Sequence, residues 1–154
     1  NTIQQVITEF LLWDIYDYST RNGHKNIAMP VLLDEMQNLN HKNNSPTGKI
    51  MREGRKFGWS TWLATQSLSS LQSGGHDLSH IYNAATQIHF AAPENQVRTI
   101  SNLLSNDKDV RQEWEAKLST LQKGECVVSG YSNINNELVR TTEIVQITSL
   151  DDRN

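Results

Sequence analysis

The sequence predicts an α/β protein, with a mostly parallel sheet flanked by helices and a C-terminal hairpin. Short and nearly continuous apolar runs are typical of buried parallel strands, and here they alternate with segments whose apolar residues recur every three or four positions, as on one face of a helix. Strands and helices that alternate in this way favour a sheet covered by helices. In such sheets, ligands collect at the carboxyl ends of the strands.

The first half of the chain should begin with a helix over residues 2–20, which ends near Asn22 and Gly23. Residues 27–33 predict a buried strand with Pro30 near its start, where a missing N–H is tolerated. A polar, Asn-rich loop follows over residues 37–45. The apolar residues that indicate the first helix are Ile3, Val6, Ile7, Phe10, Leu11 and Ile15.

A second, short helix is expected after this loop. Ser45 can cap its start, Pro46 suits its first position, and Gly58 stands where a C-terminal glycine belongs. Residues 59–66 and 86–92 then read as two further strands. The connection between them is rich in Ser and Gly and has room for at most a short helix.

The last part of the chain predicts two helices and two closing strands. Ala92 and Pro93 open the first helix, and the second ends at Gly124. The closing strands are expected at residues 125–129 and 143–147, joined as a hairpin through a turn within residues 133–136. The inward apolar positions of the two helices are Val97, Ile100 and Leu104, then Val110, Trp114, Leu118 and Leu121.

Composition limits the class of protein. A chain of 154 residues with 36% apolar content can bury one sizeable core, and its length favours a single domain. The net charge of -3 excludes a basic field over the whole molecule that would attract nucleic acid. Cys126 is the only cysteine, so an internal disulfide is excluded, and the apolar runs are too short to span a bilayer. We therefore expect a cytoplasmic protein.

Two adjacent carboxylates follow the first predicted strand. Burial of Val31, Leu32 and Leu33 should contribute about 1.5–3 kcal/mol each, which would hold the strand, and the side chains after it, rigidly. In phosphoryl chemistry Asp34 could hold Mg²⁺, while Glu35 takes a proton from an attacking water or orients it. The alternative is that both carboxylates merely end a strand at a solvated turn.

Gln66 ends the next predicted strand and would lie beside Asp34 if the two strands are neighbours. Its amide both donates and accepts hydrogen bonds, so it could position a water molecule or sense a γ-phosphate. The alternative is a strand-terminal Gln bonded to loop backbone. Residues 52–58, which read REGRKFG, directly precede this strand.

Taken in order, three segments resemble the HerA and FtsK superfamily of P-loop ATPases, and the HerA-like branch most of all. The first, VLLDEMQNL, matches a Walker B strand. The second, REGRKFGWSTWLATQSLSSL, matches a sensor strand that follows a helix ending in GRK-x-G. The third, LQKGECVVSG, matches a closing hairpin. The resemblance covers residues 1–148. It implies a RecA-like three-layer sandwich in which residues 1–154 are the C-terminal part of the ATPase domain.

The resemblance also implies an activity and partners for a longer parent protein. It implies ATP hydrolysis with Mg²⁺, with Asp34 as the metal ligand and Glu35 and Gln66 at the nucleotide. It further implies a ring, expected to be a hexamer, that translocates DNA, and some members serve restriction or defence systems. An inert scaffold or partner-docking module derived from such an ATPase is the alternative, and a Mg²⁺-dependent nuclease a more distant one.

The sequence departs from the family pattern because it has no P-loop. The nearest candidate, NNSPTGKI, has Asn43 in place of the first glycine and Ile50 in place of Ser or Thr, and it follows the Walker B strand instead of preceding it. We therefore expect the P-loop to lie upstream of Asn1. The chain by itself should bind ATP poorly.

Residues 42–56 form the one basic segment, with five cations and one carboxylate. Arg52 or Arg55 could act as an arginine finger toward the γ-phosphate of a neighbouring subunit. Lys42 and the Asn-rich loop could instead contact nucleic-acid phosphates, and a solvated helix face is the plainest interpretation. The remaining cations are Lys49 and Lys56.

Other candidate sites are weaker. His76 and His80 lie four residues apart, as metal ligands on a helix can, but Asp77 between them reads better as an N-cap and no third ligand is evident. Cys126 is expected to be a small core residue. The four Trp residues are expected to pack in the core and not to stack on bases.

Overall fold

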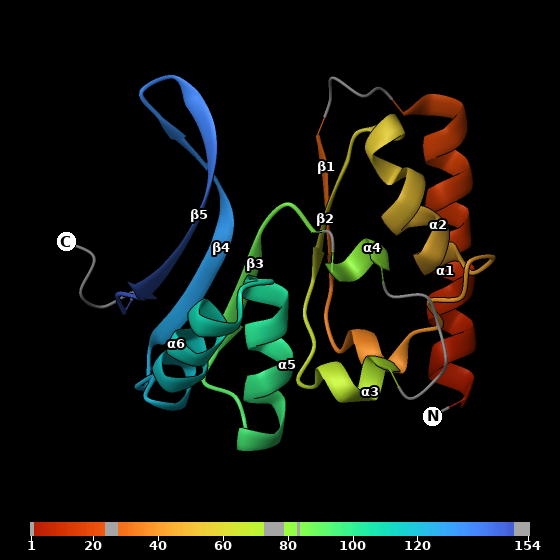
Figure 1. Cartoon of the computed structure of the whole chain (residues 1–154). Helices are drawn as coiled ribbons and strands as arrows, with labels where there is room; N and C mark the ends of the chain where they lie inside the picture. The colour runs from red at the N-terminus through yellow and green to blue at the C-terminus, as the bar shows by residue number, and fades with distance from the viewer. Residues whose placement is uncertain (1, 24–27, 73–78, 83, 150–154) are drawn as a thin grey trace. The chain divides into compact units, whose positions relative to one another are not determined.

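The computed structural model describes residues 2–23, 28–72, 79–82 and 84–149 (Figure 1). Packing divides the chain into two compact units, Asn1–Ile81 and Tyr82–Asn154, and each is described by itself. Both combine helices with a small sheet. Within the described residues, no helix has both the length and the apolar character needed to cross a membrane.

The sheet of the first unit consists of two parallel strands, β1 (Met29–Leu33) and β2 (Trp59–Leu63). Their register pairs Met29 with Trp59 and Leu33 with Leu63, so both strands end at the same edge. The two strands predicted in this part of the chain are therefore present and adjacent. Both are shorter than expected: residue 27 lies outside the described residues, and residues 64–66 belong to a loop.

One face of this sheet is covered by α1 (Thr2–Asn22), α2 (Pro46–Glu53) and the 3-10 turn η2 (Gly54–Phe57) (Figure 1). The helix and strand residues that meet there are Leu12, Tyr16, Leu33, Ile50 and Trp59, and all are buried. Full burial of each aliphatic side chain in this core contributes about 1.5–3 kcal/mol. This core fixes the position of β1.

Apolar side chains on the other face of the sheet remain exposed. Leu32 and Trp62 are direct neighbours across the two strands, and they are 69% and 62% exposed. The expectation that Leu32 would be buried with Val31 and Leu33 was wrong, because alternate residues of a strand point to opposite faces and the described elements of this unit cover one face. Val31 is half-buried and Leu33 is buried.

The predicted first helix is present as α1, but the apolar face that indicated it is not the face that is buried. The helix buries Leu12, Tyr16 and Ser19, which are spaced by three and four residues. The apolar residues that predicted it are exposed, with Phe10 at 67% and Ile3 at 77%. A helix with two apolar faces shows the helical period clearly, although that period does not tell which face packs.

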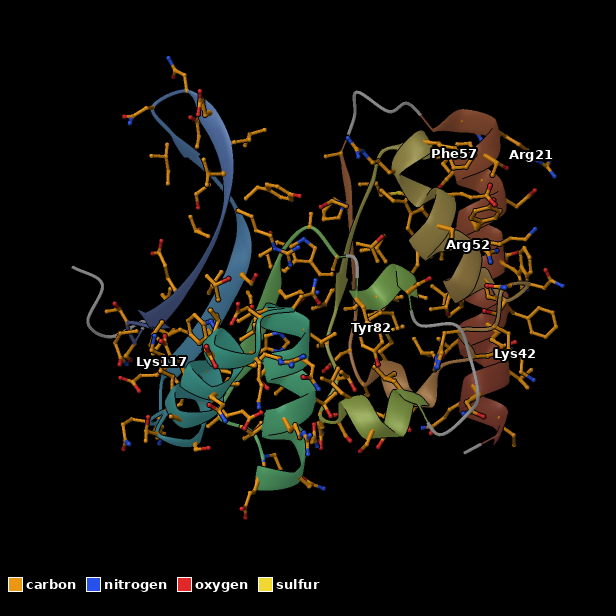
Figure 2. The ribbon with its side chains drawn as sticks, viewed as in Figure 1. Arg21, Lys42, Arg52, Phe57, Tyr82 and Lys117 are labelled. Atoms are coloured by element: carbon orange, nitrogen blue, oxygen red, sulfur yellow. The ribbon has the colours of Figure 1, made fainter. Side chains whose placement is uncertain are left out.

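The local signals around α2 are confirmed. Ser45 Oγ accepts a hydrogen bond from the Gly48 amide at 3.1 Å, and Pro46 occupies the first turn. Gly58 ends η2 with a φ of 86°, in the left-handed region where glycine carries no steric cost. An aromatic contact joins α1 to this segment, since the Tyr16 ring meets the Phe57 ring edge-on at a centroid distance of 6.1 Å, and Tyr16 also meets Trp13 within α1 at 6.0 Å. Phe57 is labelled in Figure 2.

The second unit contains a three-stranded antiparallel sheet in the order β3 (Gln87–Phe90), β4 (Glu125–Ile134) and β5 (Glu137–Gln146). The predicted hairpin is present, with a two-residue turn in which Asn135 and Asn136 have φ angles of 52° and 68°, as a type I′ turn requires. Both hairpin strands are longer than expected. Parallel pairing is confined to the first unit among the described strands, and the RecA-like sandwich stays a prediction.

Helices α5 (Glu94–Leu104) and α6 (Lys108–Ser119) belong to the second unit. Asp107 caps α6, because its Oδ1 accepts hydrogen bonds from the Asp109 and Val110 amides at 2.8 and 3.1 Å. The buried residues of the two helices include Val97 and Ile100 on α5 and Leu118 on α6. Three short helical segments complete the described chain: η1 (Met36–Asn38), α3 (Leu68–Gln72) and α4 (Ser79–Tyr82).

The second unit should lose stability in mild acid through His89 on β3. Burial lowers the pKa of His89, so the unfolded chain binds a proton more readily than the folded chain does. The free energy of unfolding should therefore fall as the pH drops below about 6.5, the pKa of a free histidine. Denaturant unfolding of the wild type and of His89→Gln at pH 7.5 and pH 5 measures this effect. We expect the variant to lose less stability over this range, and equal losses would contradict the assignment.

Candidate active site

The candidate site lies at the sheet edge where β1 and β2 both end. Hydrogen bonds continue the pairing just past the strands, because the Ala64 amide donates to the Leu33 carbonyl at 2.9 Å and the Met36 amide donates to the Ala64 carbonyl at 2.9 Å. These bonds hold the segment after β1 beside the segment after β2. Asp34 and Gln66 therefore lie at the same edge, as the sequence predicted.

Glu35 has an unusual backbone conformation at this edge. Its φ of 52° and ψ of 44° lie in the left-handed region, and Asp34 Oδ1 accepts a hydrogen bond from the Glu35 amide at 2.8 Å. A bulky residue other than glycine seldom adopts this conformation, which costs on the order of 1–3 kcal/mol and is concentrated at functional sites. The tight turn carries the Glu35 side chain toward the end of β2.

Both carboxylate oxygens of Glu35 accept hydrogen bonds from side-chain amides. Gln66 Nε2 donates to Oε1, and Gln37 Nε2 donates to Oε2. Gln37 Oε1 in turn accepts a hydrogen bond from Thr65 Oγ1 at 2.7 Å. The structure thus joins two of the predicted site residues, Glu35 and Gln66, through a direct contact. What each of them does chemically stays a prediction.

Sequence reasoning missed Gln37 and Thr65. Gln37 follows Glu35 by two positions and Thr65 immediately precedes Gln66, so both were visible as polar neighbours of predicted site residues. Their contact depends on the left-handed turn at Glu35, which no residue pattern in the sequence marks.

Asp34 is exposed at the same edge. Its Oδ1 accepts the Glu35 amide hydrogen, and a carboxylate offers further lone pairs on both oxygens. Mg²⁺ keeps several waters and needs only one or two carboxylates when phosphate oxygens complete its shell. Asp34 therefore fits a magnesium ligand of that kind. Among the described residues there is no cluster of three His, Cys, Asp or Glu that could hold a metal without such phosphates.

Arg55 of the basic segment lies apart from this edge. Arg55 belongs to η2, which precedes the amino end of β2, whereas Glu35 follows the carboxyl end of β1. Because the two strands are parallel, the sheet places Arg55 at the edge opposite to Glu35. Arg55 is therefore not placed to act at the Glu35 site of its own chain. The arginine finger was predicted toward the γ-phosphate of a neighbouring subunit, and it stays a prediction.

Two cations of the basic segment make contacts within the first unit. The guanidinium of Arg52, which is labelled in Figure 2, donates to the Asn43 carbonyl. Lys49 Nζ lies 5.1 Å from the centre of the Trp13 ring and 5.7 Å from that of the Tyr16 ring. Such cation–π contacts stabilise by about 0.5–1 kcal/mol at exposed sites. Lys42, Arg55 and Lys56 are exposed.

The weaker candidates have mixed outcomes. Cys126 is buried, and burial raises the pKa of its thiol, which confirms a core residue with little thiolate. Trp59 is buried, but Trp62 is exposed, so core packing does not describe all four Trp residues. His76 lies outside the described residues, as do Asp77 and the side chain of His80.

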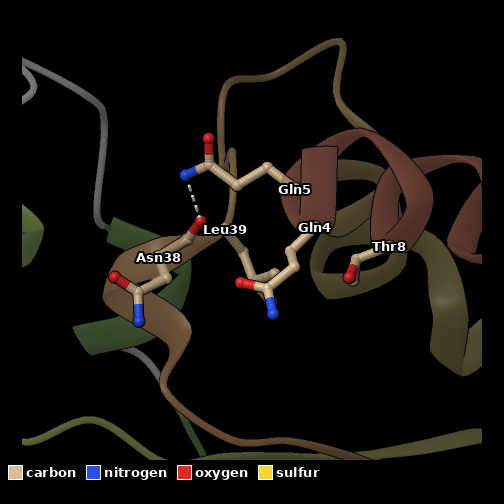
Figure 3. A pocket seen from close by; sticks show the side chains of 5 residues that line it. All are labelled: Gln4, Gln5, Thr8, Asn38 and Leu39. Carbon is tan, nitrogen blue, oxygen red and sulfur yellow. Dashed lines mark hydrogen bonds between the residues drawn. The ribbon is translucent and has the colours of Figure 1, made fainter. Parts of the chain in front are cut away.

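A small pocket of about 170 Å³ lies between α1 and the segment after η1 (Figure 3). The Gln5 amide nitrogen donates to the Asn38 carbonyl across it at 2.7 Å. The pocket is open to solvent and mostly lined by polar residues, and neither Glu35 nor Gln66 lines it. The lining residues are Gln4, Gln5, Thr8, Asn38 and Leu39.

A family model described as the TraM recognition site of TraD and TraG matches residues 29–149. The chain belongs to this family. The matched region begins at β1 and ends after β5, so it contains the whole strand-end site and most of both units. It supports the FtsK-type ATPase lineage at a coarse level. No curated protein matches the chain.

Proposed function

We propose that this region forms the C-terminal half of the ATP-hydrolysing motor domain of a coupling protein of the TraD and TraG kind, which moves DNA. The observation that carries the proposal is the contact of Glu35 with Gln66 across the ends of two parallel strands. Ligands of open α/β sheets bind at this edge, and phosphoryl transfer uses a catalytic base or a side chain that positions the nucleophile.

Each residue has a role in this proposal. Glu35 takes or orients the proton of the attacking water, and Gln66 positions that water or contacts the γ-phosphate. Asp34 would hold Mg²⁺, which neutralises phosphate charge when it is bound. The P-loop must come from sequence outside these residues, because they contain neither GxxxxGKS nor GxxxxGKT. A RecA-like sandwich, a ring of subunits and a HerA-like branch belong to the same proposal.

Loss of the Glu35 carboxylate tests the proposal. In a full-length protein that joins this region to a P-loop, Glu35→Gln should lower ATP turnover by about 10² to 10⁴-fold, because the amide cannot accept a proton. Steady-state ATP hydrolysis with purified protein measures the change. Asn40→Gln, in the loop after η1, provides a control that should keep the wild-type rate.

Robust turnover by Glu35→Gln would defeat the assignment of the general base.

The same assay tests the arginine finger when Arg55→Ala subunits are mixed with Glu35→Gln subunits. A finger that acts across a subunit boundary predicts a rate in mixed rings that departs from the sum of the two separate rates. A strictly additive rate would exclude it.

A second candidate function is the recognition of a protein partner, which the family description favours because it names TraM recognition. It also agrees with the docking-module alternative drawn from the sequence. Binding of a purified TraM protein to this chain, measured by calorimetry, tests it. Saturable binding supports this function, whereas no binding at high micromolar concentration argues against it.

A further inference from the structure

We propose that Gln37 is a positioning residue that holds the Glu35 carboxylate in place, with Thr65 as its anchor. The inference rests on the proposed ATP hydrolysis and adds two residues to the site. Neither residue is expected to touch the nucleotide. They act through Glu35.

The contacts form a continuous bridge between the two strand ends. Gln37 Nε2 donates to Glu35 Oε2, and Gln37 Oε1 accepts from Thr65 Oγ1 at 2.7 Å. Thr65 Oγ1 also accepts a hydrogen bond from the Ser67 amide at 3.3 Å, which ties the bridge to the backbone turn that carries Gln66. The carboxylate is thereby fixed relative to both loops of the edge.

A side-chain amide serves both ends of this bridge. It presents a donor to the carboxylate and an acceptor to the hydroxyl at the same time. A glutamate at position 37 would set two carboxylates against each other, and a leucine would leave Glu35 Oε2 without this donor. The amide of Gln37 is long enough to span from its own 3-10 turn to the end of β2.

The two side-chain amides that bind Glu35 differ in their exposure to solvent. Gln66 is exposed, whereas Gln37 and Thr65 are half-buried. An exposed side chain changes rotamer more freely than a half-buried one, so Gln66 can turn from Glu35 toward a phosphate or a water. Gln37 stays on the opposite carboxylate oxygen and keeps the general base aimed while Gln66 moves.

Turnover of the full-length protein tests this role. Gln37→Leu should lower kcat by about 10-fold or more, because a hydrogen bond to a charged group is lost, and should leave KM for ATP nearly unchanged. Thr65→Val should lower kcat in the same direction, and Thr65→Ser, which keeps the hydroxyl, should restore it. Asn38→Ala, on the same short helix, should keep the wild-type kcat.

A double-variant comparison distinguishes positioning from a general structural role. If Gln37 acts only through Glu35, then Gln37→Leu should cause no further loss in a Glu35→Gln background. Equal losses in both backgrounds, or a wild-type kcat in both Gln37→Leu and Thr65→Val, would overturn the inference. Circular dichroism of each variant checks that it folds.

The outcomes also separate this inference from the proposed function. If Glu35→Gln abolishes turnover but Gln37→Leu does not change it, the positioning role alone fails. If Glu35→Gln turns over at the wild-type rate, the proposed function fails and the positioning role fails with it.

Discussion

The parallel pairing of β1 with β2 is the constraint on which the candidate site depends. Because both strands run the same way, Asp34 and Glu35 after one strand lie at the same edge as Gln66 after the other, and Gln66 contacts Glu35. Packing of Leu33, Ile50 and Trp59 beneath the sheet fixes the strands, and the Ala64 backbone bonds extend their register to the edge. The polar contacts of the site would not form if either strand slipped by one residue, because each side chain would then point to the opposite face.

The edge combines a costly backbone conformation with hydrogen bonds to both carboxylate oxygens of Glu35. A left-handed Glu35 costs on the order of 1–3 kcal/mol, and the bonds from Gln37 and Gln66 help to offset it. Proteins retain such strain mainly where a side chain must be aimed. The family match covers this edge, and the family's description names recognition of a protein partner.

Local signals in the sequence predicted most elements of the chain. The Ser45 cap, the left-handed Gly58 and the Asn135–Asn136 turn each depend on a few adjacent residues, and the structure contains all three. Burial was harder to predict: α1 has two apolar faces, and Leu32 lies on a sheet face that the described residues of its own unit leave exposed. The Gln37–Thr65 contact could not be predicted, because it depends on tertiary pairing together with the Glu35 turn. The separation of Arg55 from Glu35 likewise follows from strand direction and not from spacing along the chain.

The most direct measurement is an NMR distance between the Gln66 side-chain amide and Glu35 in the 154-residue chain. Isotope labelling resolves the glutamine NH₂ protons, and a nuclear Overhauser contact reports protons within about 5 Å. The strand-end arrangement predicts contacts from both Gln66 and Gln37 to the Glu35 side chain, and their loss in Glu35→Ala. A Gln66 amide with no contact to Glu35, and with signals unchanged by Glu35→Ala, would contradict it.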